Sequence, residues 1–194
     1  MRDLVITQNI TLDGVIANDT SWFSPADEDG DTDDLNEALL AQAHASDAFL
    51  VGRTTFEEMR SYWPQQLDDA TGVTDHLNRV AKYVVSTTLE DPGWDGTTIL
   101  RGPMSTDIRT LKAADGSGIV VTGSIQLCHA LIDAGLVDEY RLFSYPHVEG
   151  RGRRLFEDRT SVRALHLVEV RPFRNGVVLL RYRTDTGQSP PASS

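Results

Sequence analysis

Apolar residues along this chain follow two periods, one typical of strands and the other typical of helices. Short runs rich in β-branched residues predict strands at 3–10, 47–52, 81–86, 97–100, 118–122, 138–148, 162–172 and 176–184. Amphipathic spacing predicts helices at 33–46, 54–60, 72–80, 105–114 and 124–134. The alternation favours an α/β fold with a mainly parallel sheet. Asn175-Gly176 lies between the last two strands and predicts an antiparallel hairpin at the C-terminal end.

Two of the predicted strand–helix junctions carry a glycine. The first reads Gly52-Arg53-Thr54-Thr55, and the second reads Gly123-Ser124-Ile125. A glycine lets the backbone approach a ligand closely, and a helix start offers unpaired N–H groups to an anion. Arg53 adds planar donors suited to phosphate. Taken singly, each junction could be an ordinary turn or capped helix, with Arg53 paired to a nearby acid. Their joint presence favours a ligand with several phosphates, although no G-x-G-x-x-G pattern occurs.

Length and composition are those of one globular domain, which we place at 1–184, followed by a disordered tail at 185–194. The net charge of −11 argues against nucleic acid as a partner, because such binding needs clustered Lys and Arg. No apolar run is long enough to span a membrane, and no signal peptide is recognisable. The single cysteine, Cys128, excludes an internal disulfide and fits a cytoplasmic protein. The acidic stretch 27–34 lacks the spacing of a calcium loop, so we expect a solvated loop and no metal site.

Three stretches, in their order and spacing, resemble the dihydrofolate reductase superfamily, and most closely the C-terminal reductase domain of the riboflavin biosynthesis deaminase-reductase (RibD). The resemblance covers about residues 1–184. It is carried by residues 10–17 (ITLDGVIA), by residues 51–57 with Tyr62-Trp63-Pro64, and by the run from Val121 to Phe156. The resemblance implies a three-layer α/β/α fold with a mixed central sheet.

The resemblance also implies that the cofactor is NADPH. Gly52, Arg53, Thr54 and Thr55 match the family's first phosphate-binding turn, on the adenosine side. Ser86 and Thr87 match the segment that contacts the adenosine ribose and its 2′-phosphate. Gly123, Ser124 and Ile125 match the turn that carries the pyrophosphate, while Ile16 and Ala17 match residues beside the nicotinamide. The cofactor supplies hydride chemistry, and the protein supplies placement and electrostatics.

The candidates for catalysis are two acids. Asp34 occupies about the position of the family's proton-donating acid, yet Asp33 and Asp34 could simply favour the start of a helix. Asp13 is a second candidate near the nicotinamide end, although Asp13-Gly14 also makes an ordinary turn.

The expected substrate region has several candidate contacts. Trp22 and Trp63 could form walls for a flat heterocycle or could pack in the core. The arginines at 151, 153 and 154 could bind a phosphorylated substrate or only balance charge, and His147 and Glu149 could lie near the substrate.

These features together predict an NADPH-dependent reductase of a small heterocycle. The resemblance implies a substrate like 5-amino-6-(5-phosphoribosylamino)uracil, or a pterin. It also implies a homodimer that meets through its C-terminal strands. The zinc patterns of a deaminase domain are absent from this chain, which weakens a direct role in riboflavin synthesis. The alternative is a ligand-binding protein of the same fold without robust catalysis.

Overall fold

The structure is a computed structural model, and it describes residues 1–16, 32–66, 69, 72–157, 160, 162 and 164–185. Ala17 and Trp22 lie outside these residues, as does the predicted tail after Asp185. Statements about the architecture refer to the described part.

Eight strands form one sheet in the order β4-β3-β2-β5-β1-β6-β8-β7. All neighbours from β4 to β6 pair in parallel, whereas β8 is antiparallel to both β6 and β7. The bounds are β1 Asp3–Thr11, β2 Ala48–Gly52, β3 Ala81–Val85, β4 Thr97–Leu100, β5 Gly118–Val121, β6 Glu139–Tyr145, β7 Leu165–Pro172 and β8 Val178–Thr184. The mixed sheet with an antiparallel C-terminal hairpin is therefore confirmed.

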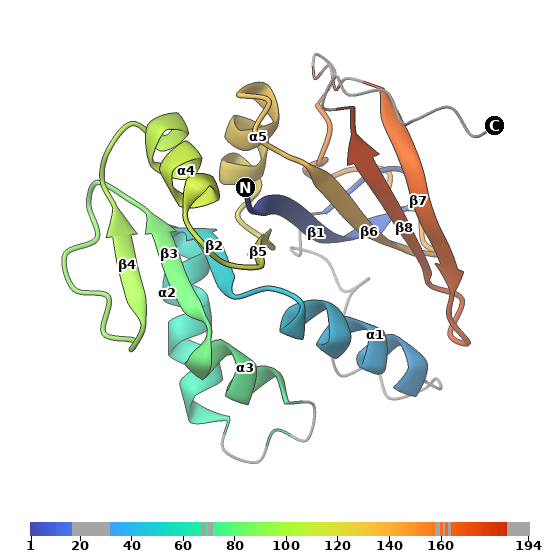
Figure 1. Cartoon of the computed structure of the whole chain (residues 1–194). Coiled ribbons are helices and arrows are strands. Elements are labelled where there is room, and N and C mark those ends of the chain that lie inside the picture. The colour runs from blue at the N-terminus through green and yellow to red at the C-terminus, as the bar shows by residue number, and fades with distance from the viewer. Residues whose placement is uncertain are drawn as a thin grey trace.

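Helices cover both faces of the sheet and complete the expected three layers (Figure 1). Leu50 and Val121 pack with α4 and α5 on one face, while Phe49 and Val51 pack with α2 and α3 on the other. Alternate residues of a strand point to opposite faces, so both sides of β2 are apolar. The bounds are α1 Asp33–His44, α2 Arg53–Tyr62, the 3₁₀ turn η1 Trp63–Gln65, α3 Val73–Arg79, α4 Met104–Ala113 and α5 Ile125–Asp133.

The main differences from the predicted bounds have local causes. The strand predicted to reach residue 148 ends at Tyr145, because Pro146 follows it and has no N–H to donate to the sheet. The expected hairpin turn forms as predicted, with Gly176 at φ 86° and the Asn175 side chain accepting a hydrogen bond from the N–H of Val177 at 3.1 Å. The helix predicted at 54–60 is one residue longer at its start and two longer at its end.

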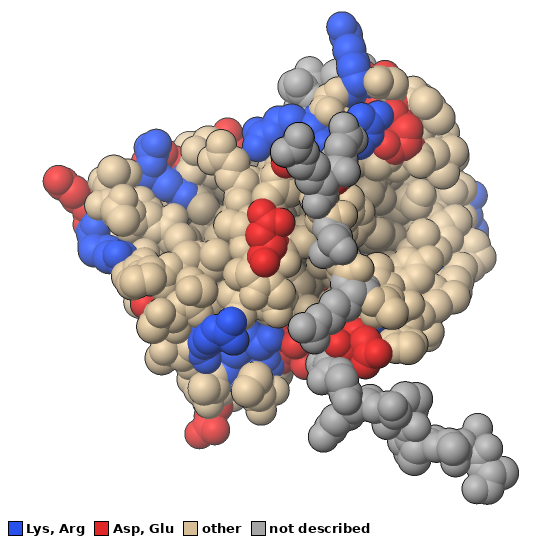
Figure 2. All heavy atoms as spheres, turned by 90° about the horizontal axis from the view of Figure 1, so that it is seen from above, with Lys and Arg blue, Asp and Glu red and all other residues tan. Residues whose placement is uncertain are grey.

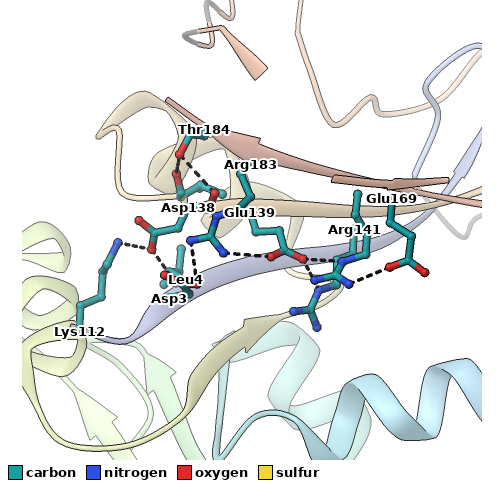
Figure 3. A network of polar contacts seen from close by, with 11 residues as sticks. Asp3, Leu4, Lys112, Asp138, Glu139, Arg141, Glu169, Arg183 and Thr184 are labelled. Atoms are coloured by element: carbon teal, nitrogen blue, oxygen red, sulfur yellow. Dashed lines mark hydrogen bonds and ion pairs between the residues drawn. The ribbon is translucent and has the colours of Figure 1, made fainter. Parts of the chain in front are cut away.

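Two adjacent acids at the start of β6 organise a polar network across the sheet (Figure 3). Asp138 pairs with Lys112 of α4 and accepts a hydrogen bond from the N–H of Leu4 at 2.7 Å. Glu139 is 2% exposed and accepts hydrogen bonds from Arg141, Arg181 and Arg183. Burial alone would raise the pKa of Glu139, but the hydrogen bonds from Arg181 and Arg141 outweigh it and hold the pKa below its usual value. The charges of Asp138 and Glu139 therefore serve to join β6 to its neighbouring elements.

Charge is mixed on the face of the molecule shown in Figure 2. Lys and Arg side chains lie there in several separate groups with acidic side chains nearby, and no continuous basic surface is visible. Among the described residues, no helix combines the length and the apolar character needed to cross a membrane.

Candidate functional site

A cleft of about 750 Å³ opens where the parallel strands β2, β3 and β5 end. Ligand sites of open α/β sheets lie at this edge, outside the carboxyl ends of the strands. Every predicted cofactor-binding residue that the structure describes lines this one cleft. These residues are Ile16, Gly52, Arg53, Thr54, Thr55, Ser86, Thr87, Gly123, Ser124 and Ile125.

The first glycine junction leads from β2 into α2. Gly52 is extended, with φ −84° and ψ 165°, and the helix begins at Arg53 without a side-chain cap. The guanidinium of Arg53 pairs with Glu57 at 3.0 Å, and both side chains remain partly exposed. Both interpretations of Arg53 therefore hold at once: it pairs with an acid, and it lines the cleft. The pairing is an exposed contact between residues four apart on a helix, which contributes little stability and can yield to a ligand.

The second junction leads from β5 into α5 through two left-handed residues. Gly123 has φ 60° and Ser124 has φ 47°, and α5 also begins without a side-chain cap. Gln8 of β1 donates its Nε2 hydrogen to the carbonyl oxygen of Gly123 at 2.8 Å. Cys128 lies next to this contact, and burial raises the pKa of its thiol to about 12. Cys128 is thus a packing residue and no nucleophile.

Ser86 and Thr87 form a third part of the lining, directly after β3. The Ser86 hydroxyl oxygen accepts hydrogen bonds from the N–H groups of Thr88 at 3.2 Å and Leu89 at 2.9 Å. Arg101 crosses this loop and donates to the carbonyl oxygens of Thr87 at 3.3 Å and Leu89 at 2.5 Å. The loop backbone is therefore fixed, while the Ser86 O–H hydrogen stays available to a ligand.

Three predicted site residues that the structure describes, Asp34, Trp63 and Asp13, lie outside the lining of this cleft. Asp34 is in the first turn of α1, where its Oδ2 accepts a hydrogen bond from the N–H of Arg174 at 3.1 Å. Its other oxygen, Oδ1, is buried and has no hydrogen-bond partner among the described residues. Trp63 packs on the cluster around Phe56 and meets Tyr62 edge-on at 5.1 Å between ring centroids.

Asp13 has a structural environment that does not suit a proton donor. Its carboxylate accepts hydrogen bonds from the Thr11 hydroxyl at 2.7 Å and from the N–H groups of Glu149 at 3.1 Å and Gly150 at 2.8 Å. The hydrogen bond from Thr11 is the largest cause that lowers the pKa of Asp13 to about 2. Such a carboxylate is ionised near neutral pH. Asp13 also lies outside the cleft lining.

The arginine cluster divides between two roles. Arg153 lines the cleft, and its carbonyl oxygen accepts a hydrogen bond from the N–H of Ile16 at 2.9 Å. Arg154 turns away and donates its Nε hydrogen to the carbonyl oxygen of Asp13 at 2.9 Å. His147 and Glu149 contact each other at 3.0 Å and are also outside the lining.

Sequence reasoning missed several residues at this site. Gln8 supports the site by its hydrogen bond to the Gly123 carbonyl oxygen. It could have been noticed in the sequence, because it is the polar residue in the otherwise apolar series Leu4, Ile6 and Ile10 on one face of β1. The lining residues that were missed come from separate segments and are Glu58, Val85, Thr88, Leu100, Gly102, Met104, Gln126, Leu127 and Ala130. Among the described residues, no three His, Cys, Asp or Glu side chains lie together as metal ligands would.

Comparison with known proteins places this chain among relatives of the expected kind. The protein "Uncharacterized protein YyaP" of Bacillus subtilis (strain 168) is 30% identical over 186 residues, which are 93% of this chain and 94% of that protein. A putative riboflavin biosynthesis protein from Shewanella sp. PV-4 has a similar structure, with a TM-score of 0.70 at 18% identity over 94% of this chain and 99% of that one.

A second solved structure has a similar fold. Dihydrofolate reductase from Enterococcus faecalis, in complex with NADP(H) and RAB-propyl, has a TM-score of 0.62 at 16% identity over 94% of this chain and 96% of that one. These structures confirm the dihydrofolate reductase-like fold. A family model described as the RibD C-terminal domain matches residues 2–179. The chain therefore belongs to the RibD C-terminal domain family.

Proposed function

We propose that this protein is an NADPH-dependent reductase that transfers hydride to a small heterocyclic substrate. The observation that carries the proposal is the meeting of two uncapped helix starts, those of α2 and α5, in one cleft beside Ile16. Unpaired N–H groups at a helix start attract phosphate, and a dinucleotide carries phosphates at separate points. Membership of the RibD C-terminal domain family supports reductase chemistry at this site.

The residues of the cleft divide the work of binding NADPH. The start of α5 would hold the pyrophosphate, and Arg53 with the start of α2 would hold the adenosine side. The hydroxyls of Ser86 and Thr87 suit the ribose and its 2′-phosphate. Ile16 offers an apolar contact next to the nicotinamide, together with Ala17. When bound, NADPH supplies the hydride, and the protein fixes its position.

The substrate side of the site rests on fewer residues. Arg153 lines the cleft next to Ile16 and suits a phosphorylated substrate such as a ribosylaminopyrimidine; a pterin is the second candidate. We keep Trp22 as a candidate wall for the ring, and Trp63 as a weaker candidate because it packs on the cluster around Phe56 outside the cleft lining. Asp34 remains the candidate proton donor on the family resemblance alone, since it lies outside the cleft lining and its Oδ2 is held by the N–H of Arg174 at 3.1 Å. Asp34→Asn should lower turnover, whereas Asp33→Asn in the same helix turn should not.

Titration with NADPH and NADH tests the cofactor. Wild-type protein should bind NADPH saturably and more tightly than NADH, as measured by nicotinamide fluorescence. Arg53→Ala should weaken NADPH binding about tenfold to hundredfold, the loss expected for hydrogen bonds to a charged group. Arg79→Ala is the matched control, since Arg79 also pairs with an acid four residues away on a helix surface, at 2.8 Å from Asp75.

Two further outcomes separate the alternatives. If neither nucleotide binds, the reductase proposal is wrong. If NADPH binds but no heterocycle in a substrate screen oxidises it, the ligand-binding alternative is favoured. Oxidation of NADPH that depends on substrate and is weakened by Arg53→Ala supports the reductase.

A further inference from the structure

The two glycine junctions are tied to each other by a reciprocal pair of hydrogen bonds. The N–H of Gly52 donates to the Ser124 hydroxyl oxygen at 3.0 Å. In return, the N–H of Ser124 donates to the Thr55 hydroxyl oxygen at 3.0 Å. The partners are 72 and 69 residues apart in the chain. We call this pair of hydrogen bonds the clasp.

The clasp holds Ser124 in a conformation that serine rarely adopts. Its φ of 47° is left-handed, and Ser124 is the one non-glycine residue with a positive φ in the part of the chain that the structure describes. A side chain in this region is strained and persists only where the surroundings enforce it. Both the N–H and the hydroxyl oxygen of Ser124 are used in the clasp, which explains how the conformation is maintained.

The second junction is also held by Gln8 of β1. Gln8 is 4% exposed, and its Nε2 hydrogen bonds reach the Gly123 carbonyl oxygen at 2.8 Å and the Cys128 sulfur at 3.3 Å. A Cβ on Gly123 would lie only 3.1 Å from the methyl carbon of Thr55. The two junctions therefore touch across a tight contact and cannot move independently.

The clasp sets the distance between two helix starts. Thr55 lies in the first turn of α2, and Ser124 directly precedes α5. A ligand that meets one helix start gains nothing from a fixed distance to the other. A ligand that spans both gains a preorganised frame, which avoids the cost of ordering the turns on binding.

We propose that Thr55 and Ser124 are positioning residues whose hydroxyls hold the two helix starts at one spacing and so select a whole dinucleotide over its halves. This inference rests on the proposed function of the cleft. It differs from direct binding of the cofactor by these two hydroxyls. If the hydroxyls contacted the cofactor directly, removing them would weaken the binding of a fragment and of the whole cofactor alike. If they only hold the spacing, removing them weakens the binding of the ligand that bridges both turns and leaves the binding of the fragment unchanged.

The binding test compares NADPH with adenosine 2′-monophosphate, a fragment that lacks the pyrophosphate and so reaches the adenosine side of the cleft alone. Thr55→Val removes the acceptor at constant shape, and Ser124→Gly removes the other hydroxyl while relieving the left-handed strain. In calorimetry, each variant should bind NADPH about tenfold more weakly, a loss comparable to that of one hydrogen bond. Its affinity for the fragment should fall less than about twofold. The double variant should bind NADPH no more weakly than either single variant, because the loss of one hydrogen bond of the clasp already releases the fixed spacing of the helix starts.

Two further variants serve as controls for these effects. Thr55→Ser keeps the hydroxyl and should restore NADPH binding. Thr110→Val removes an exposed threonine hydroxyl on α4 that donates to the carbonyl oxygen of Thr106 at 3.0 Å, and it should leave NADPH affinity unchanged.

A measurement on the free protein separates the clasp from the function. Amide hydrogen exchange should speed up at Gly52 in Ser124→Gly and at Ser124 in Thr55→Val. Wild-type NADPH affinity in both variants would overturn the proposal and leave the reductase intact. Equal losses for fragment and cofactor would also overturn it, in favour of direct contact. Failure of the wild-type protein to bind NADPH would overturn the proposed function and the selectivity together, while exchange would still show whether the clasp forms.

Discussion

Asp13 joins two segments of the chain, 11–13 and 149–150, through one carboxylate. It lies after β1, takes a hydrogen bond from the Thr11 hydroxyl, and holds the N–H groups of Glu149 and Gly150. Both oxygens of the carboxylate accept hydrogen bonds. In Asp13→Asn, the side-chain NH₂ would therefore face one of the groups that donate to the carboxylate. Asp13, which the sequence offered as a catalytic candidate, thus holds a loop beside the cleft.

The lowered pKa of Asp13 predicts how its contribution to stability depends on pH. Its pKa falls from 3.8 to about 2 on folding, so the stabilisation is complete above pH 4 and is lost as the pH falls toward 2. Urea unfolding should show Asp13→Asn to be less stable than wild type by a constant margin between pH 7 and 5. Below pH 4 the margin should shrink. A margin that stays constant down to pH 2.5 would contradict this role.

A matched substitution controls for the loss of an acid as such. Asp115 is exposed in the loop between α4 and β5. Asp115→Asn should change stability by less than about 0.5 kcal/mol at any of these pH values, as is usual for surface positions.

At the scale of elements, the segment after β6 is built onto the segment after β1. Val15 and Arg154 form an isolated antiparallel bridge, and the N–H of Leu155 donates to the carbonyl oxygen of Gly14 at 3.3 Å. This contact brings Arg153 and Ile16 to the same cleft. The close approach depends on Gly152, because a Cβ there would lie 2.7 Å from a methyl carbon of the fully buried Val15.

Gly152→Ala should therefore destabilise the protein more than Gly150→Ala. Both glycines have positive φ, but a Cβ on Gly150 would meet nothing within 4 Å. The strain of a left-handed alanine costs about 1–2 kcal/mol at either site. The clash with Val15 should add about 1–3 kcal/mol at Gly152 alone, as overpacking does. Urea unfolding of the two variants measures the difference, and equal destabilisation would show that the loop yields without cost.

The element scale also shows why some of this site was readable from the sequence. The two glycine junctions are local features, in which an apolar strand, a glycine and an amphipathic helix follow one another, and all three were recognisable. Arg153 and Met104 line the cleft only because segments distant in the sequence meet there. The acceptor role of Asp13 depends on Glu149, 136 residues away, and no local pattern carries that information. Gln8 lies between the two cases: its polarity on an apolar face was visible, but its partner Gly123 was not.

At the scale of the whole molecule, the C-terminal end of the sheet has an inner part and an outer strand of different character. At the β6 and β8 strands, charges are satisfied internally, as the three arginines around Glu139 show (Figure 3). Within the described part of the chain, the outer strand β7 pairs with β8 alone and leaves apolar side chains exposed. Leu167, Val168 and Val170 are 55%, 49% and 52% exposed. An edge strand with such side chains invites pairing with another chain.

We propose that β7 forms the contact of a homodimer, in agreement with the expectation for the C-terminal strands. Light scattering should then give twice the chain mass of 21.4 kDa at micromolar concentration. Val170→Asp should raise the dimer dissociation constant at least thirtyfold, roughly the effect of losing a contact that contributes about 2 kcal/mol. Val148→Asp places the same charge at a valine that is 63% exposed outside β7, and it should leave the dimer intact. A wild-type monomer, or a dimer that both substitutions leave unchanged, would exclude β7 as the interface, and the exposed apolar residues of this strand would then need another partner.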